Sequence, residues 1–313
     1  NYIFLIFIGL TSVLRLCRKL LQIFINVSVG LVYPVIKWVN SVLKQRVITA
    51  CVLVLVLALV LIVLPFNGFL EAISLLLVIA AWEWANMAGL SKSWQRFIYA
   101  GAFAVLFFAL MHLDLQQWTA AITSVLFFSV FGWLLALFAV WRYPENKGWQ
   151  QTWLLLLIGL WLLVPAWLGL QLLQPAVARS GLIWLVIAVI AAADIGAYFS
   201  GRRFGRRKLA VHVSPGKTWE GFWGGVLANV LLATIIALFL DLSVVKFFGF
   251  VVAMVLVAAM SVLGDLFESM IKRERGIKDS SQLLPGHGGV LDRIDGWTAA
   301  VPLFALFYLL CGS

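Results

Sequence analysis

Acidic and basic side chains are interleaved between positions 268 and 295, around the sequence PGHGG at 285–289. The acidic side chains are Glu268, Glu274, Asp279, Asp292 and Asp295, and the basic ones are Lys272, Arg273, Arg275, Lys278 and Arg293. Carboxylates can hold Mg²⁺, which bridges phosphate oxygens, while Lys and Arg neutralise charge that develops on phosphates during transfer. The glycines free the backbone for positive φ and for close approach to a ligand. The stretch therefore predicts a site for phosphate groups and a divalent cation.

His287 lies within this stretch and has the chemistry of a zinc ligand or a general base. No second His or Cys lies near it, and the cysteines Cys17, Cys51 and Cys311 are far apart and form no CxxC pair. A zinc site is therefore unsupported. We expect His287 to hydrogen-bond a phosphate or a carboxylate.

A second basic stretch runs from Arg202 to Lys217 and contains six Lys or Arg residues and no acidic residue. It ends in SPGKT, where Ser214, Lys217 and Thr218 precede a predicted helix. Hydroxyls, a lysine and a glycine beside a helix N-terminus are suited to bind phosphate, although the spacing is not that of a P-loop. The alternative is an anchor for anionic lipid headgroups.

Three carboxylates fall within apolar sequence: Asp194 in AAADIGAYFSG, Asp265 in SVLGDLFES and Glu83 in AWEW. A charge near the bilayer centre costs about 2.5–3.5 kcal/mol on insertion scales, so each is a candidate for function. Gly196 and Gly264 lie beside the two aspartates and allow close helix approach. We expect a functional role for both aspartates. For Glu83, an interfacial residue that reaches water is an equal alternative.

The elements that must position these residues are membrane helices. Of the 313 residues, 64% are hydrophobic and 12% are charged, whereas soluble domains average about 45–50% apolar and ~25% charged residues. A soluble fold would expose apolar patches far larger than monomers tolerate. Apolar runs of spanning length fall at 47–64, 70–90, 97–113, 118–141, 152–170, 181–200, 221–240, 247–265 and 297–311. We therefore expect an all-α polytopic integral membrane protein with about nine transmembrane helices.

Basic residues sort sharply between the two sides of these spans. From Lys37 onward, 18 lie on one side, and only Arg179 and Lys246 lie on the other. Basic loops stay in the cytoplasm, so the richer side, with both basic stretches, is predicted to face it. Residues 45–313 form the predicted membrane-embedded domain. Residues 1–44 are an N-terminal extension, for which an interfacial anchor, an extra span and an uncleaved leader remain open.

Four motifs together resemble the signature of the phosphatidate cytidylyltransferase family, also called CDP-diacylglycerol synthases. They are Ser269-x-x-Lys272-Arg273, Lys278-Asp279, PGHGG at 285–289 and Asp292-Arg293-x-Asp295. AWEW, ADIGAYFSG, SPGKTWEG and SVLGDLFESM extend the likeness to about residues 45–311. We find no departure from the signature.

The resemblance implies an enzyme of a bacterial inner membrane that transfers the cytidylyl group of CTP to phosphatidate and releases pyrophosphate. It implies nine helices around a polar funnel that faces the cytoplasm, a homodimer among membrane lipids, and no nucleic-acid partner. It also implies a metal centre with Mg²⁺, for which Mn²⁺ can substitute, together with K⁺.

Site residues can be assigned on this interpretation. The metal ligands are Asp265 and Asp292; the catalytic residues are Lys272, Arg273, Lys278, His287, Arg293 and Asp295; the substrate-binding residues are Asp194, Tyr198, Ser214, Lys217, Thr218, Gly288 and Gly289. Phosphatidate already carries a phosphate monoester that can attack the α-phosphorus of CTP. Positioning and charge neutralisation should therefore matter more than a protein nucleophile.

A lipid kinase and a transporter are the alternative functions. A CTP-dependent lipid-alcohol kinase of the polyprenol type would cleave at the γ-phosphate, and the full Asp-Arg-x-Asp motif argues against it. An ion-coupled transporter with Asp194 and Asp265 as a relay would be expected to contain inverted repeats, and we find no internal repeat.

Overall fold

The computed structural model describes residues 55–56, 59–60, 66–145, 150–173, 179–284, 286 and 288–311. Its elements are α3 (Phe66–Met87), α4 (Ser93–Met111), the short 3₁₀ helix η1 (Leu115–Trp118), α5 (Thr119–Arg142), α6 (Thr152–Leu172), α7 (Arg179–Phe204), β1 (Lys208–Ala210), β2 (Ser214–Thr218), α8 (Trp219–Phe239), α9 (Val244–Glu274) and α10 (Leu291–Cys311). Among these described residues, eight helices are long and apolar enough to cross a membrane. The prediction of an all-α polytopic membrane protein is confirmed.

Each of the eight helices corresponds to one predicted span. The first predicted span at 47–64 lies outside the described residues, except for 55–56 and 59–60. The predicted extension at 1–44 and the side chain of His287 also lie outside them.

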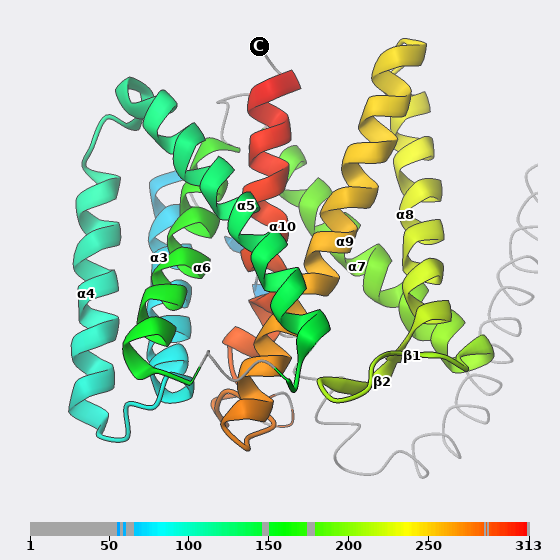
Figure 1. The fold of residues 1–313 in the computed structure, drawn as a ribbon. Coiled ribbons are helices and arrows are strands. Elements are labelled where there is room, and N and C mark those ends of the chain that lie inside the picture. The colour runs from blue at the N-terminus through cyan, green and yellow to red at the C-terminus, as the bar shows by residue number, and fades with distance from the viewer. Residues whose placement is uncertain are drawn as a thin grey trace, which may run out of the picture. The chain divides into compact units, whose positions relative to one another are not determined.

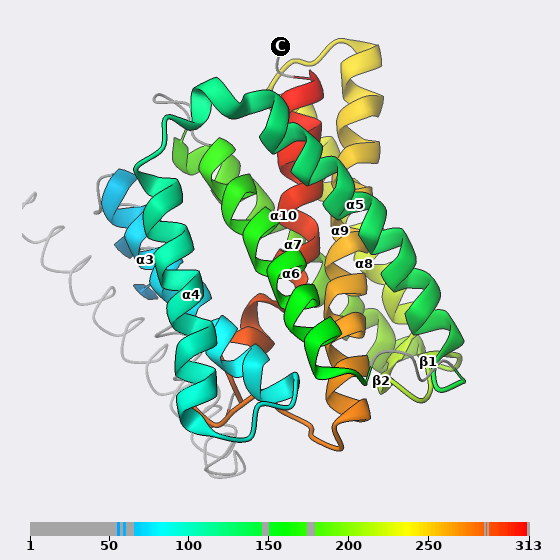
Figure 2. The same cartoon turned by 60° about the vertical axis from the view of Figure 1, so that its left-hand side comes forward.

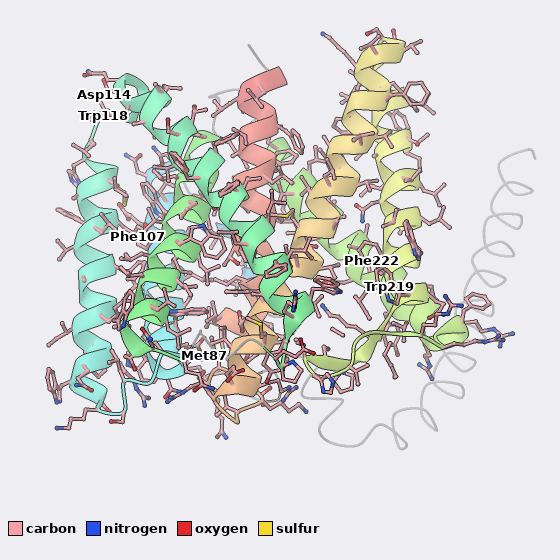
Figure 3. The ribbon with its side chains drawn as sticks, in the orientation of Figure 1. Met87, Phe107, Asp114, Trp118, Trp219 and Phe222 are labelled. Atoms are coloured by element: carbon pink, nitrogen blue, oxygen red, sulfur yellow. The ribbon has the colours of Figure 1, made fainter. Side chains whose placement is uncertain are left out.

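Successive helices run in opposite directions between the two ends of the bundle (Figure 1). The α3–α4, α7–α8 and α9–α10 connections share the end that carries β1 and β2, which we call the hairpin end, and the C-terminal end of α10 lies at the opposite end. Figure 3 shows Met87 and Trp219 at the hairpin end, and Asp114 and Trp118 at the opposite end. Both basic stretches therefore meet at the hairpin end.

Small residues hold the helices that carry the two span aspartates close to their neighbours. A Cβ atom on Gly196 of α7 would lie 2.6 Å from the carbonyl oxygen of Gly224 on α8. A Cβ atom on Gly264 of α9 would lie 2.5 Å from the carbonyl oxygen of Asp295 on α10. These separations are too short for any side chain. The prediction of close helix approach at Gly196 and Gly264 is confirmed.

Buried aromatic side chains fix α3 and α4 against α6. The Phe107 ring, labelled in Figure 3, stacks on Trp167 with 5.6 Å between ring centroids. The Trp167 indole N–H donates to the Ser74 hydroxyl at 2.8 Å, and the Trp84 indole N–H donates to the Leu155 carbonyl at 2.6 Å. Buried indoles need such partners, so these bonds also fix the orientation of α3.

Helices α9 and α10 run side by side in Figures 1 and 2, and both are longer than hydropathy predicted. The apolar runs place their facing ends at 265 and 297, but α9 continues to Glu274 and α10 begins at Leu291. Lys272 and Asp292 therefore lie on helices, and the loop over 266–296 that the predicted spans imply is wrong at both ends. The reason is that charged residues four apart on one helix pair with each other, as Glu268 and Lys272 do at 3.0 Å.

Candidate functional site

An open pocket of about 390 Å³ lies at the hairpin end between α7, α8 and β2. Most of its wall is apolar, and we call it the polar pocket for the charged side chains that it contains. Its walls include four predicted substrate-binding residues: Asp194 and Tyr198 of α7, and Lys217 and Thr218 of the hairpin. Arg202 also lines the pocket, and its guanidinium donates to the Tyr198 hydroxyl at 2.9 Å. The pocket therefore presents a carboxylate, hydroxyls and two cationic side chains on one surface.

Asp194 lies deeper along its helix than the sequence predicted. The apolar run placed it near the end of a span, but α7 continues to Phe204, about 15 Å farther along the helix axis. Asp194 is among the residues that line the pocket, so the pocket extends to this depth.

Short antiparallel pairing of β1 with β2 positions Lys217. The Thr218 hydroxyl oxygen caps α8 by accepting the Gly221 N–H at 3.1 Å. The Glu220 carboxylate, in the first turn of α8, accepts the Arg206 N–H at 3.0 Å. These bonds tie the hairpin to the start of α8, so Lys217 is held one residue before the helix cap.

An ion pair joins the hairpin to α9. The Lys217 ammonium lies 2.7 Å from Oδ2 of Asp265, and the two side chains are 27% and 36% exposed. Oδ1 of Asp265 accepts the Ser269 hydroxyl at 3.1 Å. Asp194 and Asp295 both lie within electrostatic range of Asp265. Each Asp265 oxygen accepts one of these two bonds, so the carboxylate retains lone pairs for a ligand.

A buried cluster links α9 to the first turn of α10. The Lys272 ammonium lies 3.0 Å from Oε1 of Glu268 and 2.7 Å from Oδ1 of Asp292. The side chains of Lys272, Glu268 and Asp292 are 9%, 5% and 6% exposed. Lys272 therefore directs two of its three donors at buried carboxylates that would otherwise lack a cation.

Asp292 also holds the α9–α10 connection. Its carboxylate accepts the Ser280 N–H at 3.0 Å and the Gly289 N–H at 2.7 Å, both on Oδ2. Gly288 has φ of +80°, and a Cβ atom there would lie 2.5 Å from the same oxygen. The predicted substrate-binding residues Gly288 and Gly289 therefore bring the backbone against Asp292, an approach that requires glycine.

The remaining predicted residues lie around these two clusters. Arg273 is exposed and donates from Nε to the Val213 carbonyl at 3.2 Å, which links α9 to the hairpin. Lys278 and Arg293 are exposed, and Arg293 lies within electrostatic range of Asp194. Ser214 begins β2.

Two carboxylates were not assigned roles from the sequence. Glu268 pairs with Lys272 at 3.0 Å, and the spacing of four residues on one helix was the signal that could have identified it. Glu83 is 0% exposed and accepts hydrogen bonds from the α9–α10 connection. The alternative that Glu83 is an interfacial residue reaching water is therefore wrong.

Comparison with known proteins identifies the family of this chain. A family model described as the cytidylyltransferase family matches residues 44–311. The chain belongs to the cytidylyltransferase family. The phosphatidate cytidylyltransferase of Pseudomonas aeruginosa is 45% identical over 271 residues, which cover 86% of this chain and 98% of that protein. The protein of the same name from Haemophilus influenzae is 42% identical over 284 residues, 85% of this chain and 98% of that protein. Its namesake from Brucella suis is 34% identical over 228 residues, 72% and 78% of the two chains.

The carboxylates of this cytidylyltransferase family member suit a hard cation such as Mg²⁺, which prefers oxygen ligands. Among the described residues, no three His, Cys, Asp or Glu side chains form a ready-made metal cluster. Lys217 contacts Asp265, and Lys272 contacts Asp292. Asp265 fits a metal-binding role because it retains lone pairs. Asp292 could bind a metal only by exchanging one of the bonds to Lys272 or to the connection.

Proposed function

We propose that this protein is a CTP:phosphatidate cytidylyltransferase, which makes CDP-diacylglycerol and pyrophosphate. The observation that carries the proposal is 45% identity, over 86% of the chain, to a Pseudomonas aeruginosa protein of that name. The site geometry supports it, because carboxylates and cations gather at one end of a bundle of apolar helices. A nucleotide from water and a lipid from the bilayer can meet there.

The reaction needs no nucleophile from the protein. A phosphate oxygen of phosphatidate attacks the α-phosphorus of CTP and forms the new P–O bond. The bond between the α-phosphorus and the bridging oxygen to the β-phosphorus breaks, and its electron pair leaves with pyrophosphate. Both substrates are anionic, so the protein must hold them in line and neutralise their charge.

Lys217 is the residue best placed to bind a phosphate. It lines the pocket and is 27% exposed, and only one of its three donors is directed at Asp265. Arg202 and Tyr198 of α7 line the same pocket. We propose that Lys217 binds CTP phosphates, and that the exposed Lys278 and the other predicted cations Arg273 and Arg293 bind the departing pyrophosphate.

Lys272 and Asp295 have different roles in this proposal. Lys272 is buried and pairs with both Glu268 and Asp292, so it positions Asp292 and would not readily exchange these partners for a phosphate. Asp295 lies within electrostatic range of Asp265 and adds negative charge beside it. Both residues therefore shape the charge that a bound cation would meet.

We also propose that Asp265 and Asp292 hold Mg²⁺, that Mn²⁺ can replace it, and that K⁺ binds nearby. Bound Mg²⁺ supplies positive charge to the phosphate oxygens of the transition state. Asp194 lies close enough to Asp265 to strengthen the field at that cation. Lys217, when drawn away from Asp265 by a phosphate, would leave that oxygen available as a ligand.

An apolar groove of about 610 Å³ offers a place for the lipid. Leu137 of α5, Val211 of the hairpin and Leu266 of α9 line it. Leu209 lines both this groove and the polar pocket that contains Lys217. We propose that an acyl chain of phosphatidate lies in the groove while its phosphate points toward the pocket.

The proposed location is the bacterial inner membrane, with the hairpin end in the cytoplasm. Support comes from the basic residues gathered at that end. In a variant without native cysteines, single cysteines at the exposed positions Val211 and Leu283 should react with an impermeant maleimide only from the cytoplasmic side. Labelling from outside would overturn this orientation. Chemical crosslinking in membranes tests the proposed homodimer.

One assay tests the reaction itself. Purified protein is incubated with phosphatidate, Mg²⁺ and CTP labelled at the α-phosphate. Label is expected in the lipid product. A parallel reaction uses diacylglycerol and CTP labelled at the γ-phosphate, and label in that lipid would instead identify a lipid kinase.

A further inference from the structure

We infer that Glu83 is a positioning residue for cytidylyl transfer: a buried carboxylate on α3 that clamps residues 280–281 to residues 290–291, between α9 and α10. The inference rests on the proposed function for the reaction that it serves. The clamp itself can be tested separately, because its contacts predict a local change in the connection whatever the substrate.

Each oxygen of Glu83 accepts one hydroxyl and one backbone N–H. Oε1 accepts the Ser281 hydroxyl at 2.5 Å and the Val290 N–H at 3.0 Å. Oε2 accepts the Ser280 hydroxyl at 3.2 Å and the Leu291 N–H at 2.6 Å. Glu83 is 0% exposed, so the carboxylate depends on these four donors.

Two of the four donors belong to residues 280–281, and the other two belong to residues 290–291. Ser280 lies at the start of the segment that these pairs bound, and Leu291 begins α10 at its end. Asp292 binds the neighbouring N–H groups of Ser280 and Gly289, so two carboxylates bracket the base of the segment. Asp292 belongs to α10 itself, whereas Glu83 ties the segment to a different helix.

The space around the Glu83 carboxylate is tightly filled. A Cβ atom on Gly289 would lie 2.6 Å from Oε1 of Glu83, so a side chain there would displace the carboxylate. The indole N–H of the next residue, Trp84, bonds the Leu155 carbonyl of α6 at 2.6 Å. This bond holds the turn of α3 that carries Glu83 against α6.

Only glutamate satisfies all of these contacts. The N–H groups of Val290 and Leu291 can only donate, and each faces a different oxygen of Glu83. Glutamine has one oxygen and one amide nitrogen, so one buried N–H would face an NH₂ group and lose its partner. Aspartate is shorter by one methylene. A negative charge also suits the N-terminus of α10.

The clamp acts on the site through the residues that the segment positions. Gly288 and Gly289 lie against Asp292, and Arg293 follows in the first turn of α10. Loss of Glu83 should let residues 281–284 and 288–289 move while the membrane helices stay in place. Small misplacement of groups that bind phosphate is costly, because transfer depends on alignment.

The test compares Glu83→Gln with Glu71→Gln in the intact chain. Glu83→Gln should lower kcat by about 10²-fold, a loss typical of misplaced reacting groups. Glu71→Gln makes the same change at an exposed position of α3 outside the clamp, so its kcat should stay within about threefold of wild type. A spin label at the exposed position 283 should become mobile in Glu83→Gln, while a label at Val211 on the hairpin should not.

Each outcome decides the inference. Wild-type kcat in Glu83→Gln, or an unchanged label at 283, overturns it. Equal mobilisation of both labels indicates general loosening and also overturns it. If Glu83→Gln does not fold, the double variant Ser280→Ala with Ser281→Ala must show label mobility between wild type and a denatured control, and wild-type mobility overturns the clamp. A wild-type protein without cytidylyl transfer refutes the proposed function, whereas the labels still test the clamp.

Discussion

Replacing Lys217 by alanine separates a cation that binds phosphate from one that only stabilises the bundle. The side chain lines the polar pocket and lies 2.7 Å from Asp265. Alanine removes the ammonium and leaves the β2 backbone unchanged. The adjacent cap at Thr218 uses its own hydroxyl and should remain.

The structure predicts a large effect on activity and a small one on stability. The two side chains of the pair are 27% and 36% exposed, so solvent screens their attraction. Exposed pairs contribute about 0.2–1 kcal/mol to the free energy of unfolding. By contrast, removing one preorganised donor to a transition-state oxyanion lowers kcat by about 10²–10³-fold. Lys217→Ala should therefore fold normally and lose most of its activity.

The assay is transfer of the α-phosphate label from CTP into lipid, measured with a melting curve on the same preparation. Lys208→Ala is the matched control, because Lys208 is an exposed lysine on the other strand of the hairpin. Lys217→Arg should recover part of the activity, since a planar fork replaces a point charge. Wild-type kcat in Lys217→Ala would refute the reasoning. The basic stretch from Arg202 to Lys217 would then be an anchor for lipid headgroups. A large fall in melting temperature would refute the stability argument.

Further predictions concern the metal, the helix packing and the lipid groove. Asp265→Asn and Asp292→Asn should each abolish transfer, and the double variant should be scarcely worse because the residues act as a unit; near-normal activity in either single variant contradicts a shared site. A chelator should stop the reaction and Mn²⁺ should restore it, whereas transfer that persists in chelator contradicts metal dependence. Gly224→Ala would drive a Cβ atom into a serine hydroxyl on α7 and should cost about 1–3 kcal/mol of stability; its control Gly249→Ala meets nothing within 4 Å and, since alanine is the better helix former, should not lower the melting temperature. Leu137→Trp should raise the KM for phosphatidate and not for CTP, and equal KM values in mutant and wild type would argue against the groove.

The transmembrane helices could be predicted because hydropathy reports them directly, but the facing ends of α9 and α10 could not. The run that ends at Asp265 is apolar, whereas the next turns of α9 are held by the pairing of Glu268 with Lys272. A hydropathy pattern cannot detect helix that is stabilised by charged pairs. The hairpin was missed for a related reason, because β2 has the sequence SPGKT and both proline and glycine are depleted in strands.

The chemistry of the site could be predicted from motifs, but the pairing of its residues could not. SPGKT and the Asp265 motif each indicated function, yet nothing in either indicates that Lys217 contacts Asp265. Glu83 is the extreme case, since its partner Leu291 lies 208 residues away in the sequence. Such contacts are made by the packing of α3, α8, α9 and α10 and have no local sequence signal.

Lys217, which contacts Asp265, and Lys272, which contacts Asp292, show why the pairing matters for function. Lys272 directs its ammonium at two carboxylates whose side chains are 5% and 6% exposed, whereas Lys217 contacts one that is 36% exposed. Removing one partner of a buried pair costs about 3–5 kcal/mol, because the other charge is left uncompensated. A Lys272 variant would therefore lose activity through the fold as well as through the site. Lys217 can exchange a carboxylate for a phosphate at little cost, so of these two lysines it is the one whose loss reports on catalysis.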